Sequence, residues 1–177
     1  MWKEYNKYRV MKAFFDDPLP KGGGFQLRAL ARKVRLAPKS VGIYLRQLEK
    51  EGLVVKEKYA AYPVYRADRD SEPFRLYKKL DTISSLFESG AVNRLQESLM
   101  PDCIVLFGSA SRGEDLKGSD IDLFVQCKEA KTELGGFEKA LGRKINIFFS
   151  ERFGSLSKEL RNNIINGTVL KGYLEAF

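Results

Sequence analysis

The sequence contains no histidine among its 177 residues, and it has only two cysteines and one tryptophan. Without imidazole there is no His-based metal site, no Ser–His triad and no imidazole general base. Any catalysis must therefore use carboxylates, lysine, hydroxyl groups or a bound cation. Cys103 and Cys127 each lie in or beside an apolar run, which predicts reduced thiols in a cytoplasmic protein and no disulfide framework.

Long apolar runs are also missing from the sequence. No window approaches the ~18 uninterrupted apolar residues that a membrane span needs. The N-terminal stretch MWKEYNKYRV lacks the apolar segment of a secretion signal. We therefore expect a cytoplasmic protein with no membrane partner. Its apolar fraction of 44% is ordinary for a globular chain.

Positive charge, in contrast, is present in excess, with a formal net charge of +8. Residues 1–70 hold 16 Lys and Arg against 8 Asp and Glu, whereas residues 71–177 hold 15 of each kind. A basic region of this sort usually binds a polyanion, most often nucleic acid, although a solubilising surface with no ligand explains the charge equally well. The change in charge predicts two domains, residues 1–70 and 91–177, joined by a connecting helix over residues 71–90.

The spacing of apolar residues in the first domain predicts three helices followed by a hairpin. The first helix covers residues 2–15, and the next two lie on either side of the turn at residues 36–38, as in a helix-turn-helix. Residues 53–67 alternate as a two-stranded wing. The region resembles the winged helix domains of bacterial and archaeal transcription regulators. The resemblance implies binding of double-stranded DNA and is compatible with a homodimer that reads two half-sites.

Basic and polar side chains in the two later helices are available to contact DNA. Those of the second helix would neutralise phosphates, and those of the third would reach base edges in the major groove. Gly42 and Ile43 occupy outward positions where such regulators often carry a polar pair, so a protein-contact module is the alternative. The predicted DNA-binding residues are Arg28, Arg32, Lys33, Arg35, Lys39, Ser40, Arg46 and Gln47.

Residues 91–177 alternate between helical and strand patterns, which predicts an α/β (α+β) fold with a small mixed sheet. We expect strands at 103–107, 121–125 and 144–149, and helices at 133–141 and 157–166, the last capped by Gly167. The stretch GSASRGEDLKGSDIDL begins directly after the first of these strands. The second domain therefore contains the candidate catalytic motif.

Two parts of that stretch point to phosphate and metal binding. A turn at Gly108 and Ser109 lets backbone N–H groups approach phosphate oxygens, and the serine adds a hydroxyl donor. Asp120 and Asp122 alternate on a strand, so both carboxylates face the same side, where Mg²⁺ or Mn²⁺ would relieve their repulsion. The predicted nucleotide-binding residues are Gly108, Ser109, Arg112, Lys117 and Ser119.

The combination of LFGS, a short arginine–glycine turn and SDIDL resembles the minimal proteins of the DNA polymerase beta-like nucleotidyltransferase superfamily over residues 90–175. The resemblance implies a nucleoside triphosphate as ligand, Asp120 and Asp122 as catalytic metal ligands, and a third carboxylate on a later strand. The matching position holds Asn146, an amide that cannot act as a base. Three carboxylates elsewhere remain as substitutes: Glu114, Glu138 and Glu151.

Three functions therefore stay open for this chain. The first is transfer of a nucleoside monophosphate to a hydroxyl acceptor. The second is a DNA-binding transcriptional regulator whose catalytically retired domain senses nucleotide. The third is a non-enzymatic partner module in which both domains make protein contacts. Solvated loop charges also explain Arg112 and Lys117 without any ligand.

Overall fold

The computed structural model describes residues 5–59 and 62–175. The chain divides into two compact units, Met1–Lys78 and Lys79–Phe177. The division falls within helix α4 (Glu72–Ser89), at the place where the sequence predicts a connecting helix. Over the described ranges, no helix is both long and apolar enough to cross a membrane.

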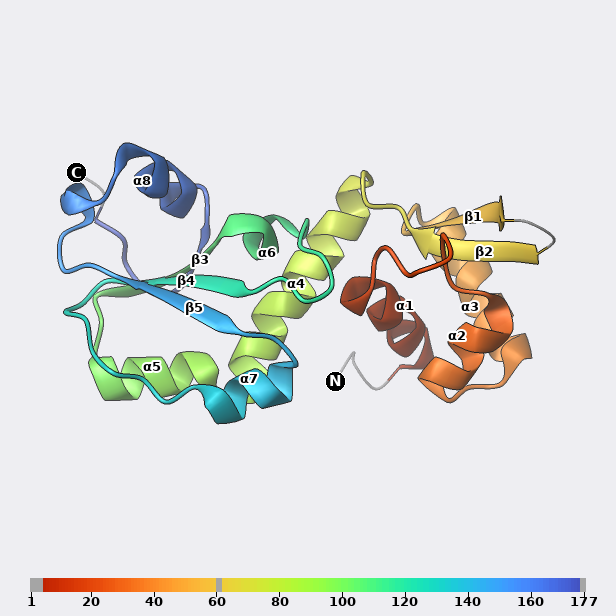
Figure 1. Ribbon diagram of the computed structural model, residues 1–177, viewed down its shortest axis with the longest axis horizontal. Helices are drawn as coiled ribbons and strands as arrows, with labels where there is room; N and C mark the ends of the chain where they lie inside the picture. Colours follow the sequence, from red (N-terminus) through yellow and green to blue (C-terminus); the bar gives the residue numbers. More distant parts are fainter. Residues whose placement is uncertain (1–4, 60–61, 176–177) are drawn as a thin grey trace. The chain divides into compact units, whose positions relative to one another are not determined.

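The first unit consists of three helices and a hairpin in the order that the apolar spacing predicts (Figure 1). Each helix buries one apolar face in a shared core, for example Leu30 of the second helix and Leu45 of the third. The start of the predicted first helix, residues 2–4, lies outside the described residues. The elements are α1 (Asn6–Asp16), α2 (Leu27–Val34), α3 (Pro38–Lys50), β1 (Val54–Tyr59) and β2 (Tyr62–Ala67).

The connection between α2 and α3 is a tight turn. Arg35 ends α2 in the left-handed backbone region with φ 52°, and Pro38 is the first residue of α3, where its missing N–H costs nothing. The Arg9 guanidinium donates a 2.6 Å hydrogen bond to the Val34 carbonyl and so fixes α1 against the end of α2. An element that the sequence patterns missed is an antiparallel bridge between Phe25 and Tyr65, which adds a third segment to the hairpin.

The second unit contains a four-stranded mixed sheet, which confirms the predicted α/β fold for this part of the chain. The strand order is β5-β4-β3-β6; β4 and β5 are parallel, and the other neighbours are antiparallel. Strand β6 was not predicted. The elements are α5 (Ala91–Leu99), β3 (Cys103–Phe107), α6 (Gly108–Arg112), β4 (Ile121–Val125), α7 (Gly135–Leu141), β5 (Ile145–Phe149), η2 (Phe153–Ser155), α8 (Lys158–Ile165) and β6 (Thr168–Gly172).

Alternate residues of the central strands face two different layers of the second unit. Helices α5 and α7 lie on one side of the sheet, and α8 lies on the other (Figure 1). Leu123 of β4 packs into the core with α5, whereas its neighbour Phe124 packs with Ile164 of α8. Because side chains alternate along a strand, Asp122 lies on the α8 side of the sheet.

Gly167 differs from its predicted role as the cap of the last helix. The helix ends one residue earlier, with Asn166 in the cap position. Gly167 instead lies against β3, where an added Cβ would be 2.5 Å from the Leu106 carbonyl oxygen. Glycine at this position therefore allows the chain to approach the sheet closely as it enters β6.

Candidate functional site

The glycine–serine turn and the aspartate pair meet at the sheet edge where β3 ends and β4 begins. The antiparallel register places Phe107 opposite Asp122, so the next residue, Gly108, lies beside that aspartate. Gly108 has φ +71°, and a Cβ added to it would lie 2.6 Å from Asp122 Oδ2. The carboxylate thus occupies the space that any other residue would fill at position 108. Tertiary structure in this way joins two motifs that are separated by more than ten residues in the sequence.

Asn146 completes the group from the neighbouring strand. In the parallel register of β4 and β5, Asn146 is directly paired with Asp122. Its side-chain Nδ2 donates hydrogen bonds to Asp120 Oδ2 and Asp122 Oδ1, both at 3.2 Å. Asp120 and Asn146 are exposed and Asp122 is half-buried, so the group is open to solvent. The amide therefore lies between the two carboxylates that the sequence predicts as metal ligands.

This donor set is suited to one divalent cation rather than to a cluster of cations. The amide N–H groups offset only part of the repulsion between two carboxylates, since an amide carries no net charge. Oxygen ligands of this kind are those that Mg²⁺ and Mn²⁺ prefer. Over residues 5–59 and 62–175, no three acidic or cysteine side chains are grouped so that they could hold a metal ion.

The three substitute carboxylates do not supply the missing third ligand. Glu138 accepts hydrogen bonds from the backbone N–H of Ile145 and from Lys144 Nζ, and these two contacts lower the pKa of Glu138 below its usual value. Glu114 forms an ion pair with Arg112 at 2.7 Å. Glu151 is exposed and belongs to no three-member acidic group in the part of the chain that the structure describes.

The other predicted nucleotide-binding residues lie in α6 and in the loop that follows it. Ser109 is half-buried in the first turn of α6. The Ser119 hydroxyl accepts a 3.0 Å hydrogen bond from the backbone N–H of Leu116 and so stabilises the turn before β4. Arg112 and Lys117 are exposed. Of the predicted set, Gly108 lies directly against the Asp122 carboxylate.

Arg143 is a site-adjacent residue that the sequence patterns did not identify. It lies between α7 and β5, and its guanidinium donates to the backbone carbonyls of Ser119 and Asp120 at 2.8 and 3.1 Å. A third contact joins it to Asp115. The only available signal in the sequence was an arginine just before a strand, which by itself indicates nothing about a contact across 23 residues.

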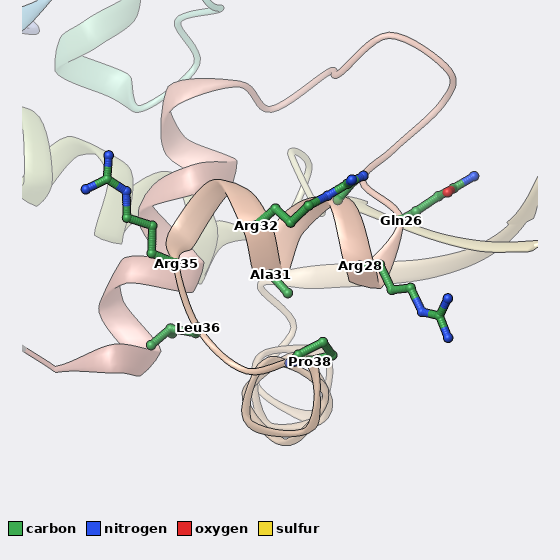
Figure 2. A pocket seen from close by; sticks show the side chains of 8 residues that line it. Gln26, Arg28, Ala31, Arg32, Arg35, Leu36 and Pro38 are labelled. Atoms are coloured by element: carbon green, nitrogen blue, oxygen red, sulfur yellow. The ribbon is translucent and has the colours of Figure 1, made fainter.

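A second group of predicted residues lies on the surface of the first unit. Arg28, Arg32 and Arg35 line a shallow hollow of about 630 Å³ beside α2, together with Gln26 and Pro38. Figure 2 shows the Arg28 and Arg35 side chains reaching out from opposite ends of that helix. The hollow thus gathers three of the predicted phosphate contacts on one face. Lys33, Lys39, Arg46 and Gln47 are exposed outside it, Ser40 is half-buried, and Ile43 is 42% exposed.

Comparison with known proteins found one family model that matches within the second unit. Residues 90–171 match the family model described as a nucleotidyltransferase domain. The match agrees with the joint LFGS and SDIDL motif and supports a nucleotidyltransferase domain in this part of the chain. Searches among curated proteins and among solved structures found no match.

Proposed function

We propose that the second unit binds a nucleoside triphosphate together with one divalent cation, Mg²⁺ or Mn²⁺. The observation that carries this proposal is the contact of Gly108 with Asp122, within a domain that matches nucleotidyltransferases. The glycine lets the Asp122 carboxylate lie against the backbone at the start of α6, and the Ser109 hydroxyl is a donor for phosphate oxygens. Asp120 and Asp122 are the residues that would hold the cation.

The chemistry available at this site is transfer of a nucleoside monophosphate. A hydroxyl oxygen of the acceptor forms a bond to the α-phosphorus and gives up its proton to solvent, while the bond to the bridging oxygen breaks and pyrophosphate leaves. A cation on the two aspartates would neutralise triphosphate oxygens and make that phosphorus more electrophilic. Asn146 cannot take the proton from the acceptor hydroxyl, because its amide has no basic site at neutral pH. We therefore infer that transfer by the native chain is slow.

Replacing Asp122 with alanine is expected to remove cation-dependent nucleotide binding. The substitution deletes one of the two charges that would hold the cation, so the affinity for Mn²⁺ should fall at least about tenfold, the size of a lost charge contact of ~1.4 kcal/mol or more. Titration of Mn²⁺ by electron paramagnetic resonance, with and without triphosphate, measures this directly. Transfer of label from α-labelled triphosphates to an RNA and protein extract measures activity in the same samples.

Asp70→Ala is the matched control for this experiment. Asp70 is an exposed aspartate of the first unit, so the same loss of charge there should leave Mn²⁺ binding unchanged. Failure of the wild-type chain to bind either Mn²⁺ or a triphosphate would rule out the proposed site. Label transfer that survives in Asp122→Ala would show that any activity arises elsewhere.

We also propose that the first unit binds double-stranded DNA. The supporting observation is the arrangement of Arg28, Arg32 and Arg35 around one hollow, in a unit with an excess of positive charge. Combined with the site above, DNA binding gives the alternative function: a transcriptional regulator whose second unit senses nucleotide without turnover. If this alternative holds, triphosphate alters the affinity for DNA while no label is transferred.

The double variant Arg28→Gln, Arg32→Gln is expected to weaken DNA binding at all sequences alike. Each arginine that contacts a phosphate contributes about 1 to the slope of log K against log salt, so the slope should fall by about 2. Gel-shift titrations at several salt concentrations measure this slope. Arg94→Gln, an exposed arginine of α5, is the control. If the wild-type chain forms no complex with DNA at low salt, the proposal of DNA binding is wrong. The exposed Ile43 then favours a protein-contact module.

A further inference from the structure

The guanidinium group of Arg143 connects two separate parts of the loop that leads to the aspartate pair. Nη1 forms an ion pair with Asp115 Oδ2 at 3.0 Å. Nε donates to the Ser119 carbonyl at 2.8 Å, and Nη2 donates to the Asp120 carbonyl at 3.1 Å. All three nitrogens of the planar group are therefore engaged, each with a different partner.

Burial makes this connection stronger than an ordinary surface pair. The Asp115 side chain is only 3% exposed and that of Arg143 is 18% exposed. Charges removed from water attract more strongly, and the planar guanidinium fixes the direction of each hydrogen bond. By comparison, the pair of Arg112 and Glu114 is 51% and 36% exposed, so solvent screens it.

The two ends of this connection belong to the two halves of the functional site. Asp115 comes directly after Glu114, whose backbone N–H is bonded to the Ser109 carbonyl, so it continues from α6. Asp120 is one residue before β4 and carries one of the two carboxylates. Arg143 thus sets the position of the Asp120 backbone relative to the glycine–serine turn.

We propose that Arg143 is a positioning residue for the cation and triphosphate site. It touches neither ligand; it holds the main chain of Asp120 so that the carboxylate stays beside Asp122. The inference rests on the proposed function, because its consequence is measured at the cation. Lysine cannot replace it fully, since a single ammonium cannot reach a carboxylate and two carbonyls in this geometry.

The test uses variants that separate positioning from folding. Arg143→Met alone removes the ion pair of the buried Asp115 carboxylate and is expected to lower the melting temperature. The double variant Asp115→Asn, Arg143→Met removes that charge and should recover most of the melting temperature. We expect the double variant to bind Mn²⁺ at least about fivefold more weakly than wild type, with a broadened resonance spectrum. The Mn²⁺ affinity of Arg143→Lys should lie between those of the wild type and the double variant.

Arg66→Met is the matched control. Arg66 also pairs with a carboxylate, that of Glu57, and donates to the Ala67 carbonyl, but it lies in the hairpin of the first unit. Its removal should leave Mn²⁺ binding unchanged. A folded double variant with wild-type Mn²⁺ affinity would overturn the positioning role.

Hydrogen–deuterium exchange distinguishes failure of this inference from failure of the proposed function. Faster exchange over residues 115–122 in the double variant supports the positioning role without any ligand, and unchanged exchange contradicts it. If the wild-type chain binds no Mn²⁺, the proposed function fails, while the exchange measurement still decides whether Arg143 holds the main chain of Asp120. Mn²⁺ binding by the wild type, with weaker binding and faster exchange in the double variant, supports both the proposed function and the positioning role of Arg143.

Discussion

Replacing Asn146 with aspartate is expected to raise nucleotidyl transfer by about 100-fold or more, the lower range for a positioned general base. The amide lies 3.2 Å from both aspartate carboxylates and is paired in register with Asp122. A carboxylate at this place would supply a proton acceptor and a third ligand. The stoichiometry of bound Mn²⁺ in the presence of triphosphate should then rise from one to two. Label transfer and Mn²⁺ titration measure the two effects.

In the absence of cations, Asn146→Asp should destabilise the folded chain. Three carboxylates would face one another where the amide now donates two hydrogen bonds, so the free energy of unfolding should fall. We expect a lower melting temperature in EDTA and recovery on adding Mn²⁺, because a ligand that binds only the folded state stabilises it. Asn163→Asp, on the exposed surface of α8, controls for the added charge. Unchanged stoichiometry and no gain in transfer would show that Asn146 does not limit the site.

Replacing Gly108 with alanine is expected to weaken triphosphate binding strongly. The glycine has φ +71°, a region that costs an L-residue about 1–2 kcal/mol. The new Cβ would also lie 2.6 Å from Asp122 Oδ2, so the carboxylate has to move away from its present position. We expect the affinity for Mn²⁺ and triphosphate to fall at least about tenfold, measured by calorimetric titration.

The variant Gly22→Ala separates the effect of backbone strain from the effect of the clash with Asp122. Gly22 has φ +83° and no atom within 4 Å of an added Cβ, so this variant carries the backbone strain without the clash. Gly108→Ala should lose at least as much stability as Gly22→Ala in thermal denaturation, and only Gly108→Ala should lose ligand binding. Retention of full Mn²⁺ affinity in Gly108→Ala would show that the contact with Asp122 is not needed for the site.

Much of the fold of the second unit follows from local patterns. The apolar runs at residues 103–107 and 121–125, the second interrupted only by Asp122, are strands in the structure, because a buried central strand needs a largely apolar stretch. Strand β6 escaped prediction, since its residues are mostly exposed at a sheet edge and show no such run. The helix expected at residues 133–141 begins instead at Gly135, as helix ends depend on contacts that local spacing does not record.

The sequence by itself determined most of the order of the elements, the basic first unit and the motif with Asp120 and Asp122, because periodicity, charge and residue spacing are local properties. Only the tertiary structure decided that the Asn146 amide lies between both carboxylates and that Arg143 holds the main chain of Asp120. These contacts join residues 23 to 26 positions apart. Their existence depends on the parallel register of β4 and β5, which the packing of the whole sheet fixes and no short stretch of sequence encodes.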